Sequence, residues 1–321
     1  MTPPRRVVLF ANFRSSRTVD GISAARSAFE VAGVPLTEIP TDSPEDLDQK
    51  IRVHGRAHDT IVIGGGDGTL NAAADALLDL KKPLGILPLG TANDLARTLG
   101  LPPDPAAAAR VIAAGHTRQI DLGRVNDRWF FNAASVGLPV AIARAHDPEL
   151  KRRLKVFAYV VATWRALKGM RRFGVRIEVD GQKVVTRAIQ VTVGNGVHFG
   201  GGMTVRADAS IDDGQLDVFA LEARHFLDLV RLAPIIRFGL QQRDRQVLTF
   251  RGREVRIETR RPRSVNTDGE ITTRTPAVFS VMEKAITVHV PAPPRSPFAR
   301  LGLELPVGRP GFSLHRPTAE K

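Results

Sequence analysis

The stretch that decides the fold is Ile61–Asn71, which reads IVIGGGDGTLN. With Asp59 and Thr60 in front, its start forms the short apolar run DTIVIG, which is typical of a β-strand buried on both faces. Three glycines follow, and an Asp-Gly-Thr leads into the Ala-rich segment Thr69–Leu80, whose spacing indicates a helix. The stretch therefore predicts a strand that ends in a glycine loop, with a helix directly after it.

The glycine loop is suited to binding phosphate. Glycines let backbone amides approach phosphate oxygens closely, and the start of a helix adds further amides. A plain tight turn between strand and helix is the alternative interpretation, and the loop fits neither GxxxxGK[ST] nor GxGxxG. Asp67 stands out because a carboxylate repels phosphate unless a divalent cation or a transferable proton lies between them. The loop therefore points to a magnesium nucleotide.

A second loop of the same kind follows the next apolar strand, Leu84–Pro88, and residues 87–96 read LPLGTANDLA. Adjacent parallel strands place their C-terminal loops side by side, so the polar residues of both loops are expected to line one crevice. These residues are Thr69, Asn71, Thr91, Asn93 and Asp94. Taken alone, Asn93 or Asp94 would be interpreted as a helix N-cap.

The chain changes character near residue 121. Before it, strand patterns (7–12, 36–39, 59–64, 84–88) alternate with helix patterns (20–33, 43–57, 69–80, 93–99), which predicts a parallel sheet. After it, turns at Asn126-Asp127 and Asp180-Gly181 separate long strand patterns, the second of which runs on to Val193. Helices are expected at 149–172 and 223–238, and short strands at 246–250, 255–259, 277–281 and 286–290.

These patterns predict an α/β plus β fold. Residues 1–121 are expected to form an α/β nucleotide-binding domain with a parallel sheet, and residues 122–291 a mainly antiparallel β domain that accepts the second substrate. Residues 292–321 are rich in proline and predict an irregular tail, for which packing on the first domain stays open.

Composition excludes several classes of protein. The 321 residues contain no cysteine, which rules out disulfides, Cys-ligated metals and a thiol nucleophile. A net charge of +13 favours an anionic partner, but aromatics make up only 6%, and no nucleic-acid motif accompanies the arginines. We therefore expect no nucleic acid, and instead a phosphorylated ligand or an anionic membrane surface.

The basic residues concentrate in residues 149–172, with eight Lys or Arg against one Glu, and in residues 251–263. Both segments are expected to rest on anionic lipid headgroups, with solvated surface faces as the alternative. The apolar run Val156–Thr163 is too short to span a bilayer, which takes about 20 residues. The N-terminus reads as a cytoplasmic first strand rather than a leader.

Five motifs together carry a family resemblance: GGGDGTLN, LPLGTANDLA, FFNAASVG at 130–137, ASIDDGQLDV at 209–218 and NTDGE at 266–270. In this order they resemble the diacylglycerol-kinase catalytic-domain family, and within it the soluble bacterial YegS-like lipid kinases, which are relatives of sphingosine and ceramide kinases. NAD kinases and phosphofructokinases share only GGDGT. The resemblance implies an NAD-kinase/diacylglycerol-kinase-like fold that binds ATP between its two domains and phosphorylates a lipid hydroxyl.

The resemblance also implies site residues. Glu270 matches the proton acceptor, Asp67 competes with it for that role, and Asp67 and Asp94 are candidates for organising Mg²⁺. Without the resemblance, Asp268-Gly269 is only a hairpin turn. The implied ATP-binding residues are Asn12, Thr41, Gly64, Gly65, Gly66, Asp67, Gly68, Thr69, Leu70, Asn71, Ala72, Gly90, Thr91 and Asn93.

Two details complete the resemblance. The family's Asn-Pro-x-Ser-Gly loop is here Asn12-Phe13-Arg14-Ser15-Ser16, so the part that this loop plays is open, and Arg14 or Arg17 is an alternative phosphate contact. The segment Ser210–Gln215 resembles a structural magnesium site, with Asp213 as the carboxylate and Ser210 and Gln215 beside it. An acidic turn without metal is the alternative.

The sequence thus predicts a cytoplasmic lipid kinase, peripheral at the inner face of the membrane, that uses ATP and Mg²⁺. Its acceptor is a hydroxyl of diacylglycerol, phosphatidylglycerol, ceramide or a sphingoid base. A kinase of a soluble metabolite, similar to NAD kinase, is one alternative, and a catalytically silent lipid- or nucleotide-binding regulator is another. The sequence does not indicate an oligomeric state.

Overall fold

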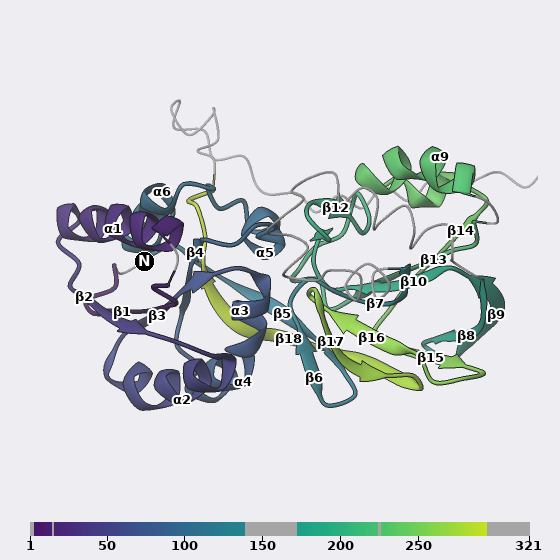
Figure 1. Cartoon of the computed structure of the whole chain (residues 1–321), viewed down its shortest axis with the longest axis horizontal. Coiled ribbons are helices and arrows are strands. Elements are labelled where there is room, and N and C mark those ends of the chain that lie inside the picture. Colours follow the sequence, from purple (N-terminus) through teal and green to yellow (C-terminus); the bar gives the residue numbers. More distant parts are fainter. Residues whose placement is uncertain (1–2, 15, 139–171, 224–225, 294–321) are drawn as a thin grey trace, which may run out of the picture. The chain divides into compact units, whose positions relative to one another are not determined.

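Figure 1 shows the computed structural model of the chain, which describes residues 3–14, 16–138, 172–223 and 226–293. Met1–Pro291 forms one compact unit, and Ala292–Lys321 is assigned to a second. The predicted packing of the tail falls almost entirely outside the described residues, as does most of the basic segment 149–172. The expected domain boundary at residue 121 stays a prediction.

The first sheet is mainly parallel where the glycine loops are. Strands β2, β1, β3 and β4 lie side by side in parallel, as the alternating strand and helix patterns predict. The remaining strands join the sheet in antiparallel pairs, except for one parallel contact between β18 and β4. The ten strands are β1 (Val7–Ala11), β2 (Leu36–Pro40), β3 (Thr60–Gly65), β4 (Leu84–Pro88), β5 (Thr117–Val125), β6 (Arg128–Phe130), β8 (Phe173–Val179), β9 (Gln182–Ala188), β15 (Glu254–Thr259) and β18 (Ala277–His289).

Helices cover both faces of the parallel part, and apolar side chains seal each contact (Figure 1). Ile22 and Phe29 of α1 and Ile112 of α6 pack on one face, and Ile51 of α2 and Leu77 of α4 contribute to the core on the other. The helices here are α1 (Ser16–Val31), α2 (Pro44–His54), the 3-10 helix η1 (Gly55–Ala57), α3 (Asp67–Ala72), α4 (Ala74–Leu80), α5 (Asp94–Thr98) and α6 (Pro105–Ala114). Strands buried from both sides explain the uninterrupted apolar runs in the sequence.

The second sheet is antiparallel, in the order β14-β13-β10-β7-β16-β17. Its strands are β7 (Ala133–Gly137), β10 (Gln190–Gly194), β13 (Leu216–Leu221), β14 (Val247–Gly252), β16 (Ser264–Thr267) and β17 (Glu270–Arg274). One face packs against the antiparallel strands of the first sheet, and the other against helix α9 (Phe226–Arg237). The short pair β11 (His198–Phe199) and β12 (Met203–Thr204) and the 3-10 helix η2 (Gln241–Arg243) complete the described elements. The predicted fold class is therefore confirmed.

Three sequence predictions about elements were wrong in detail. Residues 277–281 and 286–290 belong to the single strand β18, whose register against β5 shifts between Met282 and Ile286, with Lys284 at φ 50°. A bulge of this kind interrupts the apolar alternation without ending the strand. Residues 182–194, expected to form one strand, form β9 in the first sheet and β10 in the second, and the chain passes between the sheets at Ile189. Helix α6, which begins at Pro105 with Asp104 as N-cap, was not predicted.

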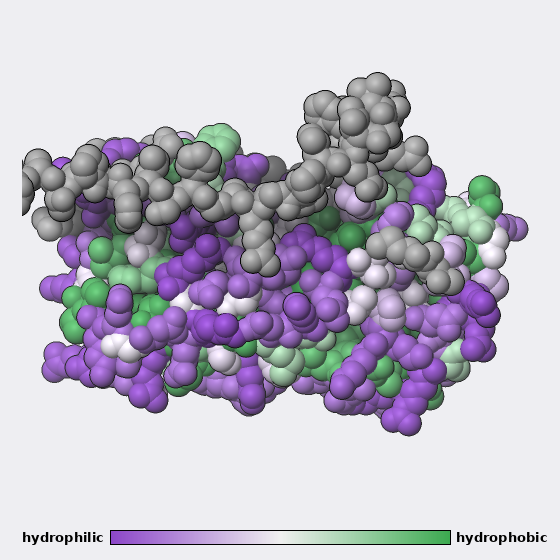
Figure 2. Space-filling view, turned by 180° about the vertical axis from the view of Figure 1, so that it is seen from behind, coloured by the Kyte–Doolittle hydropathy of each residue, from purple (hydrophilic) through white to green (hydrophobic). Residues whose placement is uncertain are grey.

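The surface is mainly polar. Figure 2 shows that hydrophilic residues cover most of the face seen from behind, with hydrophobic patches between them. None of the helices in the described ranges combines the length and the apolar character needed to cross a bilayer.

Candidate active site

The two glycine loops meet at one edge of the first sheet. In the register of the parallel strands, Ala11 pairs with Gly64, and Gly65 pairs with Pro88, so the chain leaves β1, β3 and β4 side by side. A Cβ atom on Gly90 would lie 2.4 Å from the Cα atom of Gly66. Only glycine permits this approach of the two backbones, which explains why both loops need glycine.

Asn93 stabilises the second loop. Its Oδ1 accepts a hydrogen bond from the Gly90 amide at 3.0 Å, and its Nδ2 donates to the Gly90 carbonyl at 3.0 Å. Asn93 has φ 51° and immediately precedes α5, so it supports the loop rather than accepting from the first turn of that helix as a side-chain cap. Thr91 lies exposed in the same loop.

Asp67 connects the first loop to the second. Its carboxylate accepts hydrogen bonds from the amides of Asp94 and Leu95, both at 3.0 Å, and from Asn132 Nδ2 at 3.1 Å. Both oxygens therefore have donors, and a carboxylate near the first amides of a helix is favourable. The geometry suits Asp67 to holding the start of α5 in place, and the general-base role is better suited to Glu270.

Asp94 is buried, at 5% exposure. Its Oδ2 accepts a hydrogen bond from the Gly201 amide at 2.9 Å, while its Oδ1 is buried and has no hydrogen-bond partner among the described residues. Burial raises the pKa of Asp94, and the Gly201 amide acts in the opposite direction. A buried carboxylate oxygen without a partner suits a proton or a cation.

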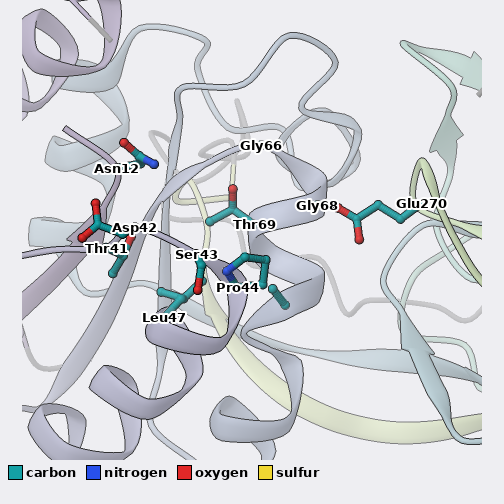
Figure 3. A pocket seen from close by; sticks show the side chains of 11 residues that line it. Asn12, Thr41, Asp42, Ser43, Pro44, Leu47, Gly66, Gly68, Thr69 and Glu270 are labelled. Atoms are coloured by element: carbon teal, nitrogen blue, oxygen red, sulfur yellow. The ribbon is translucent and has the colours of Figure 1, made fainter. Parts of the chain in front are cut away.

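A cavity of about 310 Å³ opens beside the first loop, and Figure 3 shows the side chains around it. It is lined by Asn12, Thr41, Asp42, Ser43, Pro44, Leu47, Gly66, Gly68, Thr69, Ala72 and Glu270. Glu270 extends from the start of β17 toward the first turn of α3 (Figure 3). A Cβ atom on Gly68 would lie 2.9 Å from Glu270 Oε1, so this carboxylate faces the glycine loop directly.

Asp268, two residues before Glu270, is a second carboxylate at this site. It accepts hydrogen bonds from the amides of Phe131, Asn132 and Ala133 and from Asn71 Nδ2. Burial raises the pKa of Asp268 to about 7, although the three backbone amides lower it. The Asp-Gly hairpin turn expected from sequence alone is present, and it also carries this network of hydrogen bonds.

The structure brings together most of the residues predicted from sequence. Asn12, Thr41, Gly66, Gly68, Thr69, Ala72 and Glu270 line the cavity, while Asp67, Asn71, Asp94, Gly90 and Asn93 lie in the loops and contacts next to it. Gly64 and Gly65 are part of β3 instead, and Leu70 is buried in the core. Their nucleotide contact stays a prediction.

Sequence reasoning missed Asp42, Ser43, Pro44 and Leu47 as cavity residues. Ser43 and Pro44 were identified only as a helix start, and Ser43 does accept a hydrogen bond from the Asp46 amide. Their position directly after β2, a parallel strand of the same sheet, is the signal that could have found them. Arg14, expected as a possible phosphate contact, pairs with Asp42 at 2.9 Å; the side chain of Arg17 lies outside what the structure describes.

The turn Ser210–Gln215, expected to bind magnesium, is held by charged and polar contacts. Asp213 Oδ2 lies 2.6 Å from Arg251 Nη2, and its Oδ1 accepts from the Gln215 amide at 3.0 Å. Ser210 Oγ donates to Asp212, which pairs with Arg118. No group of three or more His, Cys, Asp or Glu side chains that could hold a metal ion occurs among the described residues. The turn thus fits a guanidinium better than a bare cation, and magnesium here stays a prediction in which Arg251 has to move.

Unlike the turn Ser210–Gln215, the residues around the cavity beside the glycine loops are of the kinds that bind a nucleotide together with its cation. The cavity offers the hydroxyl-bearing residues Thr41, Ser43 and Thr69 beside a glycine loop with no side chain to block phosphate. Mg²⁺ in kinases usually takes one or two carboxylates and completes its shell with phosphate oxygens and water. Asp94 has a carboxylate oxygen without a hydrogen-bond partner among the described residues, and its part in holding a cation stays a prediction.

Comparison with protein families agrees with both halves of this architecture. Residues 6–125 match the diacylglycerol kinase catalytic domain, and residues 132–290 match the YegS C-terminal NAD kinase beta sandwich-like domain. The chain belongs to the diacylglycerol kinase family. It is therefore an ATP-dependent lipid kinase, as the sequence motifs predicted.

Relatives within this family extend over most of the chain. A diacylglycerol kinase of Staphylococcus haemolyticus is 28% identical over 272 residues, which cover 84% of this chain and 81% of the relative. One from Staphylococcus aureus is 29% identical over 266 residues, covering 82% and 84%. A crystal structure of a provisionally named diacylglycerol kinase from Bacillus anthracis superposes with a TM-score of 0.77 at 28% identity, covering 90% of this chain and 96% of that one.

Proposed function

We propose that this lipid kinase transfers the γ-phosphate of ATP to the free hydroxyl of diacylglycerol, with Glu270 as the proton acceptor. The observation that carries the proposal is the position of Glu270, which lines the cavity and whose carboxylate lies directly beside Gly68 of the glycine loop. Diacylglycerol is the acceptor favoured among the candidate lipids because the matched staphylococcal relatives are named diacylglycerol kinases.

The chemistry requires a base and a phosphate on opposite sides of one hydroxyl. The hydroxyl oxygen forms a bond to the γ-phosphorus, the bond from that phosphorus to the β,γ-bridging oxygen breaks, and ADP leaves with the electron pair. The hydroxyl proton passes to the Glu270 carboxylate. Most of the rate enhancement in such reactions comes from positioning and charge stabilisation, and the base adds a smaller factor.

The chain's own residues divide the remaining tasks. In this proposal the amides of the loop Gly66–Thr69 bind phosphate, and Thr41 and Ser43, which line the same cavity, contact the rest of the nucleotide. Asp67 fixes α5, which in turn places Asp94. Magnesium bound with the nucleotide would neutralise phosphate charge, and Asp94 Oδ1 is the oxygen that would hold it.

Glu270→Gln is the direct test. It keeps the shape of the side chain but removes the base, so we expect kcat to fall by roughly 10²- to 10⁴-fold with little change in the KM for ATP. Asp67→Asn should also lower kcat, but with a lower unfolding temperature, because it disturbs two amide contacts of α5. Radiolabelled ATP and diacylglycerol in mixed vesicles provide the assay. Undiminished turnover by folded Glu270→Gln would contradict the base assignment.

To identify the acceptor lipid, the wild-type protein is assayed with each candidate lipid in turn. Vesicles containing diacylglycerol, phosphatidylglycerol, ceramide or a sphingoid base are each offered with labelled ATP, and the products are identified by mass spectrometry. NAD serves as the soluble alternative. Preference for another lipid would replace diacylglycerol in the proposal, phosphorylation of NAD alone would replace the lipid, and no turnover with any acceptor would favour a silent regulator.

We also propose that the kinase works peripherally at the cytoplasmic face of an anionic membrane. The basic segment 251–263 is described by the structure, and five of its six arginines fall into two groups, while Arg263 stacks over the ring of Phe173. Arg251 and Arg253 pair with acidic side chains. By contrast, Arg256, Arg260 and Arg261 are exposed, and no ion pair involving them is found among the described residues. These three supply the positive charge available to lipid headgroups.

A further inference from the structure

The position of Glu270 depends on a two-residue hairpin turn. Strands β16 and β17 pair Thr267 with Glu270, so Glu270 is the first residue after the turn Asp268-Gly269. Both turn residues have positive φ, 48° and 104°, and the Gly269 amide donates to Asn266 Oδ1 at 3.0 Å. Whatever fixes this turn therefore also fixes the direction in which Glu270 leaves it.

The carboxylate of Asp268 fixes the turn to a neighbouring segment of the chain. Its Oδ2 accepts from the Phe131 amide at 2.6 Å, and its Oδ1 accepts from the amides of Asn132 and Ala133 at 2.9 and 3.1 Å. The Asp268 amide donates to the Ala133 carbonyl at 3.0 Å. Three consecutive backbone amides thus converge on one side chain.

The same carboxylate also reaches the helix that follows the glycine loop. Asn71 Nδ2, on α3, donates to Asp268 Oδ2 at 3.3 Å. From the other side, the side chain of Asn132 donates to Asp67, the first residue of α3. A ring of contacts therefore runs from Asp67 through Asn132 and Asp268 to Asn71 and returns along α3. Gly68 lies on the α3 part of this ring, and the Glu270 carboxylate lies directly beside it.

We propose that Asp268 is a positioning residue for the phosphoryl transfer: it ties the Glu270 hairpin to α3 and so sets the distance between the base and the phosphate-binding loop. This inference rests on the role proposed for Glu270. Asp268 itself lies outside the cavity lining, so it acts through Glu270 rather than on a substrate. A misplacement of about 1 Å between reacting groups can lower a rate by about 10²-fold. A contact that holds Glu270 at a fixed distance from the phosphate-binding loop would therefore raise the rate.

The chain contains a matched control for this proposal. Asp180 occupies the same position in another Asp-Gly hairpin turn, with φ 45°, and its carboxylate accepts hydrogen bonds from the amides of Arg253 and Glu254. That turn connects β8 and β9, and none of its residues lines the cavity. Asp180→Asn removes the same kind of contact and should affect stability without a specific effect on turnover.

The experiment compares Asp268→Asn with Asp180→Asn at about pH 8, where the Asp268 carboxyl is mainly ionised. We expect Asp268→Asn to lower kcat by about tenfold or more while the KM for ATP stays within about twofold, because the nucleotide loop is intact and only the base is displaced. Asp180→Asn should keep the wild-type kcat. Rates are corrected for the folded fraction, measured by circular dichroism.

Asn71→Ala provides a second variant, which leaves the turn intact and removes one donor to the same carboxylate. We expect a smaller fall in kcat, about threefold, in the same direction; should Asp268→Asn fail to fold, this variant decides. Turnover in both variants equal to that of Asp180→Asn would overturn the inference while Glu270→Gln remains impaired. Full activity of Glu270→Gln would instead remove the proposed base.

Discussion

At the residue scale, the carboxylates of the site differ in what surrounds them. Both carboxylate oxygens of Asp67 accept hydrogen bonds, and the carboxylate of Asp268 accepts four. Asp94 keeps one buried oxygen without a hydrogen-bond partner among the described residues. Glu270 is exposed to the cavity. A base needs access to its substrate, whereas a carboxylate enclosed by amides is held in one geometry. The surroundings therefore suit Glu270 to chemistry and the others to holding or charge neutralisation.

Because the pKa of Asp268 is raised in the folded protein, we also expect the stability of the protein to depend on pH. Burial raises its pKa from 3.8 to about 7, so between these values the folded protein keeps a proton that the unfolded chain releases. The contribution of this group to stability is therefore complete below about pH 4 and is lost as the pH rises through about 7. Asp268→Asn cannot titrate there. We expect the unfolding temperature of the wild type minus that of the variant to decrease over this range.

Scanning calorimetry of both proteins across this range checks the prediction, with Asp180→Asn as the control that should run parallel to the wild type. A difference that grows with pH would mean that the amides of Phe131, Asn132 and Ala133 outweigh the burial of the carboxyl group.

The sequence predicted the glycine loops and Glu270 because their chemistry is local or lies in a recognisable motif. It did not predict that Asn132 contacts Asp67, or that Asp268 contacts Asn71, because 65 and 197 residues separate these partners. Asp42 and Ser43 were missed for a related reason. They border the cavity only because β2 lies beside β1 in the folded sheet.

At the element scale, the acidic turn Ser210–Gln215 behaves as a charged connection between strands. Asp213 and Asp217 share Arg251, which lies on β14, and Asp212 pairs with Arg118 on β5. Burial raises the pKa of both Asp213 and Asp217, and Arg251 lowers both. The guanidinium of Arg251 therefore supplies positive charge at the turn where the sequence predicts magnesium, and the magnesium stays a prediction.

Arg251→Gln tests this assignment. Removing the guanidinium leaves the partly buried Asp213 without its counter-charge and Asp217 with Arg206 alone, so we expect the unfolding temperature to fall by several degrees. Millimolar Mg²⁺ should restore part of that loss in the variant and change the wild type little relative to EDTA. Strong stabilisation by Mg²⁺ of the protein with Arg251 intact would instead favour an ion at this turn, provided that an Asp94→Asn variant is stabilised to the same extent.

At the scale of the whole molecule, the net charge of +13 matters through its location. Arg260 and Arg261 are exposed in the described part of the second basic segment. We expect Arg260→Gln/Arg261→Gln to bind anionic vesicles more weakly than the wild type, with the difference shrinking as salt screens the charges over about 10 Å at 0.1 M. Sedimentation with phosphatidylglycerol vesicles measures it.

Arg5→Gln/Arg6→Gln is the matched control, because it removes two adjacent exposed arginines, for which no ion pair is found among the described residues, from the start of the first sheet. Equal weakening by the two double variants would mean that only total charge matters. Vesicle binding that is insensitive to salt would contradict an electrostatic contact altogether.

Strand β18 belongs to the same sheet as the glycine loops, but it is the last of the strands of that sheet to be synthesised. It pairs with β5 along most of its length and also with β4 and β15, and His289 at its end bonds to Thr60 of β3 through a buried contact of 3.1 Å. A nascent chain that has emerged from the ribosome only as far as residue 125 therefore contains both glycine loops but lacks the strand that completes their sheet. Translation must proceed through Glu270 before that strand is available, so the sheet that carries the glycine loops is completed only after the proposed base has been synthesised.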